Sequence, residues 1–305
     1  MTTAYAHTTV SAPVGPLLTA WLGTLLISRW PEILIREGLG VEIPWINVVW
    51  ITSAAALTGG GWVIPALRPF RAYFAVMLAV VLLTTIVDPA VRGALFGSDE
   101  PPPGEAQLTR LFIERVLLAV AALALVPILA LLGFRGRDAY LSAGWLSAPS
   151  GLKLRRDREL RWSVLGPVAM LALAAITAAF ASSFVTPTAE LWSRALPLLP
   201  IAWAAAALNA FAEEVLYRAA LLGPLASAIG AGSAVWILAV WFGVGHFYGG
   251  IPSGVMGLVI AGSLALLFGK AMIDTKGLAW PWALHFAADA AIYTFLALAF
   301  VSAAA

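Results

Sequence analysis

The sequence alternates between long apolar stretches and shorter polar connections. Nine stretches are long enough, or nearly so, to cross a membrane as helices: 13–29, 46–67, 72–87, 111–134, 163–184, 195–222, 232–248, 251–269 and 278–302. A helix that spans the hydrocarbon core needs roughly 20 predominantly apolar residues. The 72–87 stretch is short, and the three glycines at 59–61 can break the stretch before it. The pattern therefore predicts an all-α, polytopic transmembrane helix bundle with about eight spans, eight or nine.

Two connections are longer than the others. Residues 88–110 contain a Pro-Pro-Pro-Gly run, which cannot continue a helix. Residues 135–162 carry seven of the 18 basic residues: Arg135, Arg137, Lys153, Arg155, Arg156, Arg158 and Arg161. By the positive-inside rule this loop faces the cytoplasm, and with nine spans the N-terminus does so too while the C-terminus lies outside. Because Trp145 and Leu152 accompany its arginines, the loop is either an interfacial segment or a solvated topogenic loop.

The composition agrees with a protein embedded in lipid. Hydrophobic residues make up 61% of the chain and charged residues 11%, compared with about 25% charged residues in soluble domains. We expect a multi-pass integral protein of the cell inner membrane, with lipids as neighbours. The net charge of +2 is too small to indicate nucleic acid binding, and the lack of cysteine excludes thiolate nucleophiles and disulfides. No basic residue precedes the first apolar stretch, so we expect that stretch to remain as an uncleaved helix.

Ionisable side chains gather in the C-terminal spans, where burying them in a membrane is costly and indicates function. Three spans after residue 195 carry them: Glu213, Glu214 and Arg218 in 195–222, His246 in 232–248, and His285 with Asp289 in 278–302. In the N-terminal part, Glu114 and Arg115 are placed near the start of a span, within reach of lipid headgroups, and His7 lies in a polar tail. We assign these three residues no role.

Helical spacing shows which of these ionisable residues can lie side by side, because residues four apart share a helix face. Three pairs have this spacing: Glu214 with Arg218, Phe242 with His246, and His285 with Asp289. Glu213 is rotated by about 100° from Glu214, so the two carboxylates need not meet the same partner. If the three helices turn these faces inward, one polar cavity is lined by Glu213, His246, His285 and Asp289.

Each motif alone has a plainer explanation. A Glu–Arg pair can be purely structural, and a single histidine near a helix end is often a hydrogen-bonded packing residue. These structural explanations are less convincing for all three motifs together, because three neighbouring spans would each have to carry unrelated and costly groups. Their joint occurrence favours a functional site.

The motifs EExxxR at 213–218, FxxxH at 242–246 and HxxxD at 285–289 occur in this order, each within an apolar helix. This arrangement resembles the CPBP family, the CAAX-processing and bacteriocin-processing intramembrane glutamic proteases, also called the Abi family. The resemblance covers roughly residues 195–300. We therefore divide the chain into N-terminal membrane helices and a basic loop at 1–162, of unassigned role, and a peptidase core at 163–305.

The resemblance implies an intramembrane endopeptidase that needs no cofactor or metal and acts on a peptide or membrane protein. Glu213 and His246 match the pair that activates a water molecule. His285 and Asp289 match the pair that stabilises the oxyanion, and the supporting positions are Glu214, Arg218 and Phe242. At position 289 the family accepts Asn or Asp. An ionised Asp289 cannot donate a hydrogen bond, so we expect it to accept from a ring nitrogen of His285 and orient that ring.

Two other functions are compatible with these residues. A metal-dependent membrane protease can use two His, two Glu and one Asp as zinc ligands, although the chain contains no HExxH motif. A transporter or a peptide-binding regulatory scaffold can use intramembrane carboxylates and histidines as a proton relay, although no inverted repeat or pair of broken helices is visible. Glu213-dependent cleavage separates the enzyme from the scaffold.

Overall fold

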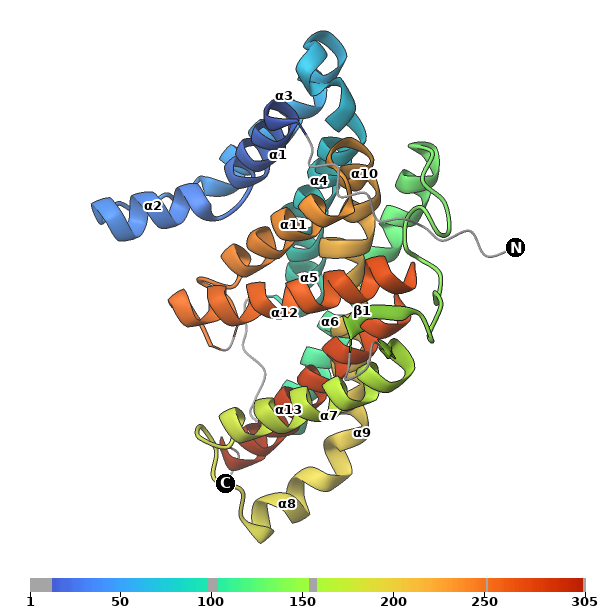
Figure 1. The fold of residues 1–305 in the computed structure, drawn as a ribbon. Helices are drawn as coiled ribbons and strands as arrows, with labels where there is room; N and C mark the ends of the chain where they lie inside the picture. Colours follow the sequence, from blue (N-terminus) through green and yellow to red (C-terminus); the bar gives the residue numbers. More distant parts are fainter. Residues whose placement is uncertain (1–12, 98–103, 154–157, 251, 304–305) are drawn as a thin grey trace.

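The computed structural model describes residues 13–97, 104–153, 158–250 and 252–303 (Figure 1). Within these ranges the chain is built of helices, with a single antiparallel hairpin formed by β1 (Pro149–Lys153) and β2 (Glu159–Arg161). The prediction of an all-α polytopic bundle is therefore confirmed. His7, Arg155 and Arg156 lie outside the described residues.

All nine predicted apolar stretches correspond to helices: α1 (Val14–Leu26), α3 (Ile46–Val63), α4 (Arg71–Leu82), α6 (Glu105–Leu131), α7 (Trp162–Ala181), α9 (Leu199–Glu214) continuing into α10 (Ala220–Ile229), α11 (Ala231–Gly245), α12 (Gly254–Thr275) and α13 (Ala279–Ala303). Short π-helical turns follow α4 at Leu83–Val87 and join α9 to α10 at Val215–Ala219. In the described ranges seven helical segments are long and apolar enough to cross a membrane, while α1 and α11 are shorter apolar helices.

Several boundaries differ from the sequence prediction. Helix α3 continues through the glycines at 59–61, and α5 (Asp88–Phe96) together with the first turns of α6 occupies much of the predicted connection at 88–110. The short helices α2 (Trp30–Leu39) and α8 (Ala189–Ala195) were not predicted. Helix α2 has Pro31 in its first turn and ends at Gly40, whose φ of 68° suits glycine. These are ordinary helix start and stop signals, but α2 is too short and too polar to appear as an apolar stretch.

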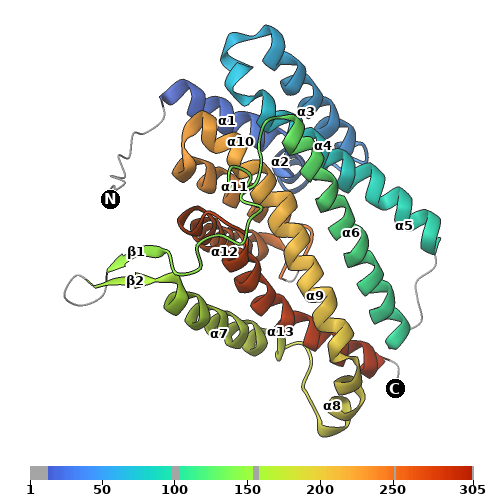
Figure 2. The same ribbon diagram turned by 90° about the vertical axis from the view of Figure 1, so that its right-hand side faces the viewer.

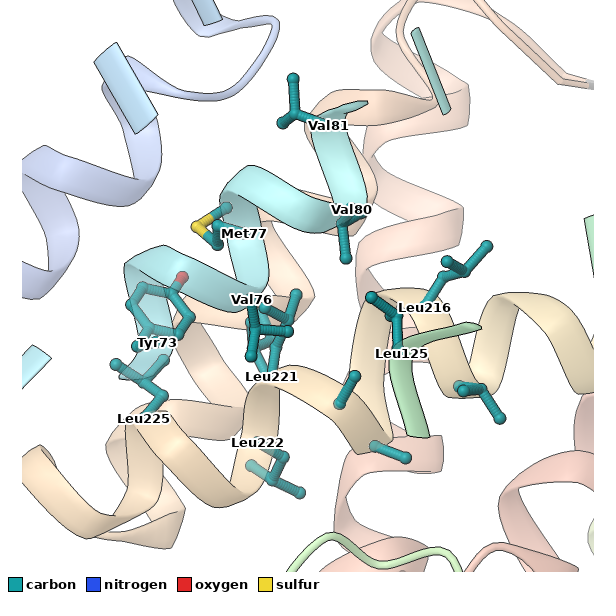
Figure 3. Close-up of a cluster of buried hydrophobic side chains, with 14 of the residues drawn as sticks. Tyr73, Val76, Met77, Val80, Val81, Leu125, Leu216, Leu221, Leu222 and Leu225 are labelled. Atoms are coloured by element: carbon teal, nitrogen blue, oxygen red, sulfur yellow. The ribbon is translucent and has the colours of Figure 1, made fainter. Parts of the chain in front are cut away.

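The helices pack as a bundle in which the N-terminal and C-terminal halves share one core. Helix α9 packs against both α6 and α13, α11 packs against α12, and α13 packs against α7 (Figure 2). Figure 3 shows the main apolar cluster, where side chains of α4 meet those of α6, α10 and the π-turn before α10. The Tyr73 hydroxyl also shares a hydrogen bond of 2.7 Å with Thr24 Oγ1 and so joins α4 to α1. The first helices are thus packed directly on the C-terminal ones.

Helices α11 and α12 approach each other through glycine. A Cβ at Gly243 would lie 2.5 Å from the Leu258 carbonyl oxygen and 3.0 Å from the Gly262 Cα. Small residues allow such close backbone packing between membrane helices. The contact fixes the C-terminal end of α11 at Gly243, three residues before His246.

Candidate active site

Glu213 and Glu214 end α9, and a π-helical turn follows them at once. Such turns are frequent at functional sites. The Glu213 side chain is 19% exposed, whereas that of Glu214 is 0% exposed. Glu213 lines a cavity of about 450 Å³, and His246 lines the same cavity. The two neighbouring carboxylates therefore have different surroundings, one facing the cavity and the other buried between the helices.

His246 caps the C-terminal end of α11. Its Nδ1 lies 2.9 Å from the carbonyl oxygen of Phe242, one turn earlier. A carbonyl oxygen can only accept, so Nδ1 carries the proton, and Nε2 of the neutral ring is left as an acceptor. The Phe242 ring also packs against the imidazole, with centroids 4.4 Å apart. The geometry fixes the ring and leaves one nitrogen able to take a proton.

Glu214 and Arg218 form the predicted ion pair along their helix. The Arg218 guanidinium lies over two aromatic rings, 5.2 Å from the Phe242 centroid and 5.4 Å from the Phe268 centroid. Glu214 Oε1 also accepts from His285 Nδ1 at 2.8 Å. This buried pair therefore joins α9 to α13 and packs against α11 and α12.

His285 lies on α13 between three carboxylates. Its Nε2 is 3.7 Å from Glu213 Oε2 and 3.7 Å from Asp289 Oδ1. Both separations exceed hydrogen-bond length. The expected hydrogen bond from His285 to Asp289 is not formed among the described residues; the ring donates to Glu214 instead, and Asp289 stays within ion-pair distance. A carboxylate on the facing helix can reach Nδ1 directly, whereas Asp289 stands one turn along the same helix.

Asn209 is a site residue that the sequence analysis missed. It lies on α9 one turn before Glu213. Its Nδ2 is 2.9 Å from Asp289 Oδ2 and 3.3 Å from Glu213 Oε1. One amide thus donates to a carboxylate on each of two helices. The available signal was an asparagine four residues before the glutamate in an otherwise apolar helix.

Arg115 is the second missed residue, and its predicted place near the lipid headgroups is wrong. Helix α6 begins at Glu105, so Arg115 lies almost three turns inside it. Its Nε donates to the Tyr293 hydroxyl at 2.8 Å, and the side chain lines the same cavity as Glu213. The neighbouring Glu114 belongs instead to a group of ion pairs, 3.0 Å from Arg92 and 3.2 Å from Arg110.

The remaining cavity wall comes mostly from the N-terminal half of the chain. It includes residues after α1, on α3 and on the π-turn after α4: Ser28, Arg29, Trp50, Thr84 and Thr85. His285 and Asp289 are not among the described lining residues and lie behind Glu213. The region 1–162, to which the sequence assigned no role, therefore contributes directly to the site.

The described polar side chains of the site do not form the ligand set of a metal centre. Zinc sites place nitrogen and oxygen ligands about 2.0–2.2 Å from the ion. Among the described residues, no group of three or more His, Asp or Glu side chains is arranged to hold a metal ion. His246 and His285 each use Nδ1 in a hydrogen bond to a protein oxygen.

Comparison with known families bears on the segment that carries these motifs. Residues 194–291 match the family model described as type II CAAX prenyl endopeptidase Rce1-like. We refer to these residues, which are similar to that family, as the Rce1-like segment. The Rce1-like segment contains all three motifs, from Glu213 to Asp289, and the resemblance inferred from them is confirmed. No curated protein and no solved structure matches the chain.

The Rce1-like match and the apolar helices together support a multi-pass membrane protein with a segment similar to CAAX-type endopeptidases. The family acts on peptide bonds, so a peptide or protein is the class of substrate that it implies. The glutamate-dependent chemistry and the role of each residue go beyond this match and are argued next.

Proposed function

We propose that the chain is a glutamate-dependent intramembrane endopeptidase in which Glu213 and His246 activate the hydrolytic water. The observation that carries this proposal is that both side chains line one cavity, although they come from different helices. Glu213 offers a carboxylate, and His246, whose Nδ1 is held by the Phe242 carbonyl oxygen, offers Nε2. These are the groups that a general base and a proton carrier require.

The reaction uses one water molecule and no cofactor. As the water oxygen attacks the scissile carbonyl carbon, its proton passes to Glu213 and the carbonyl electrons move onto the oxygen. His246 Nε2 then takes this proton from Glu213. When the tetrahedral intermediate collapses, the carbonyl re-forms, the C–N bond breaks and His246 passes the proton to the leaving amine. Because the cavity lies between packed helices, charges within it interact more strongly than they would in bulk water.

Three further side chains position this pair. Glu214 holds Arg218 on its own helix and His285 on α13, so it fixes the rotation of α9 beside Glu213. Asn209 fixes the Glu213 carboxylate from the other side. We infer that residues 163–305 form the peptidase core and that the N-terminal helices complete its substrate cavity.

A cleavage assay in proteoliposomes tests the proposal. The substrates are a farnesylated peptide that ends in a CAAX tetrapeptide and the same peptide without farnesyl, with products identified by mass spectrometry. The parent should cut at a single bond and release two fragments. Glu213→Gln should lose at least about 10²-fold in rate, within the range that general acid–base catalysis contributes.

The control is Glu190→Gln, which changes an exposed carboxylate on α8 in the same way. It should keep the parental rate. A parent that cleaves neither peptide, or a folded Glu213→Gln protein that cleaves at the parental rate, would contradict the proposal. If Glu213→Gln still binds the peptide without cleaving it, the catalytic assignment is strengthened over a peptide-binding scaffold.

A further inference from the structure

An arginine shares the cavity with Glu213 and His246, and the mechanism above gives it no part. Arg115 reaches the cavity from α6, a helix outside the Rce1-like segment. Its Nε is fixed by the hydroxyl of Tyr293, which lies on α13 two turns after His285. A guanidinium has five N–H donors in a fixed plane. With Nε held by Tyr293, the terminal N–H groups are the part left to face the cavity.

The other arginine and the two threonines on the cavity wall already have partners. Arg29 pairs with Glu32 at 2.9 Å and lies 5.1 Å from the Trp50 ring centroid. The hydroxyls of Thr84 and Thr85 donate to carbonyl oxygens of their own helix at 2.8 and 2.6 Å. Among the described lining residues, Arg115 is thus the cation that has no carboxylate hydrogen-bonded to it.

The charges around the site explain what such a cation can do. Glu213, Glu214 and Asp289 bring three carboxylates together, and an oxyanion would add a fourth negative group. Arg218 is engaged by Glu214, while His285 Nδ1 donates to Glu214 and its Nε2 stands 3.7 Å from two carboxylates. An ionised Asp289 has no proton to donate. A cation that faces the cavity would offset this negative charge, and Arg115 is such a cation.

We propose that Arg115, held by Tyr293, donates hydrogen bonds to the oxyanion of the tetrahedral intermediate. This proposal rests on the proposed peptidase function. Charge-assisted hydrogen bonds from arginine are short and strong, and a donor aimed at developing charge acts mainly on the transition state. Arg115 is then a catalytic residue supplied by the N-terminal half of the chain, and Tyr293 is a positioning residue.

The first test separates transition-state from ground-state binding. Arg115→Gln should lower kcat on the farnesylated peptide by about 10²–10³-fold, as loss of an oxyanion donor does, and leave KM nearly unchanged. Arg115→Lys should recover part of the loss, and Tyr293→Phe should lower kcat by about tenfold with the same KM. Arg68→Gln, an exposed arginine away from the cavity, is the matched control and should behave like the parent.

The second test needs no turnover. A phosphinate pseudopeptide of the same sequence carries a tetrahedral anion at the scissile position, and its affinity is measured by thermophoresis beside that of an N-methylated, uncleavable amide. Arg115→Gln should weaken phosphinate binding by about 10²-fold and leave amide binding unchanged, because transition-state analogues report interactions made in the transition state.

Parental kcat in Arg115→Gln, a higher KM at parental kcat, or equal phosphinate affinity in Arg115→Gln and the parent would overturn the role of Arg115. If Arg115→Gln fails to fold, Arg115→Lys and Tyr293→Phe decide by the same two measurements. A parent that binds phosphinate through Arg115 but cleaves no peptide would overturn the peptidase function, and would show that Arg115 is only an anion-binding residue.

Discussion

Removal of Arg218 should destabilise the protein more than any change at the exposed surface. The Arg218 and Glu214 side chains are 3% and 0% exposed, and the pair is enclosed by aromatic rings. Arg218→Met would leave the Glu214 carboxylate buried, with His285 as its remaining partner. Breaking a buried pair in this way costs about 3–5 kcal/mol. A typical protein has a total stability of about 5–15 kcal/mol, so the loss is a large fraction of it.

The reasoning predicts that a second substitution restores stability. In the double variant Arg218→Met with Glu214→Gln, the uncompensated charge is gone, and the glutamine oxygen can still accept from His285. We expect the double variant to be more stable than Arg218→Met alone, although both lack the ion pair. The matched control is Arg68→Met, which should stay within about 0.5 kcal/mol of the parent because it alters an exposed residue.

The assay is reversible unfolding in mixed micelles with increasing SDS, followed by tryptophan fluorescence. Folded yield after size-exclusion chromatography gives an independent measure. If Arg218→Met unfolds at the parental SDS fraction, the pair is not a structural requirement. If the double variant is less stable than Arg218→Met, the buried charge is not the cause of the loss.

Three further outcomes are expected. Gly243→Ala should displace α12 and lower cleavage, because the new Cβ would lie 2.5 Å from the Leu258 carbonyl oxygen, whereas Gly232→Ala on the same helix meets open space and should keep parental activity; equal rates for the two would contradict this. Asp289→Asn should cost about tenfold or less, or 1.4 kcal/mol, since it still accepts from Asn209, and Asp289→Ala should cost far more; an Asn variant as inactive as the Ala variant would refute it. Treatment with EDTA should leave the cleavage rate unchanged, and a loss that zinc restores would indicate a metal-dependent protease.

The spans and the C-terminal half of the site could be predicted because both follow from the cost of polar groups in lipid. The apolar stretches predicted every long helix in the described part of the chain. Ionisable residues in three spans predicted that Glu213, His246 and His285 lie together, and Glu213 and His246 do line one cavity. The spacing of four residues also gave the Glu214–Arg218 pair, since that spacing is a local property of one helix.

The missed features depend on contacts between distant segments. Arg115 was placed near the membrane surface because it lies close to the start of the apolar stretch at 111–134. Helix α6 begins six residues earlier, at Glu105, so Arg115 lies well inside the helix. Its partner Tyr293 lies 178 positions away in sequence. The partner of His285 was misassigned for the same reason, because Asp289 is close on its own helix while Glu214 comes from another one. The hairpin β1–β2 is short and polar, so it gave no apolar signal.

The origin of the oxygen in the product tests the central claim most directly. The parent is allowed many turnovers of the farnesylated peptide in water enriched in oxygen-18, and both the product and the protein fragment that contains Glu213 are examined by mass spectrometry. If Glu213 acts as a base toward water, each product carboxylate gains one labelled oxygen and Glu213 gains none. Label in the Glu213 carboxylate would show that it attacks the peptide itself, and labelled product from Glu213→Gln at the parental rate would show that this residue does not activate water.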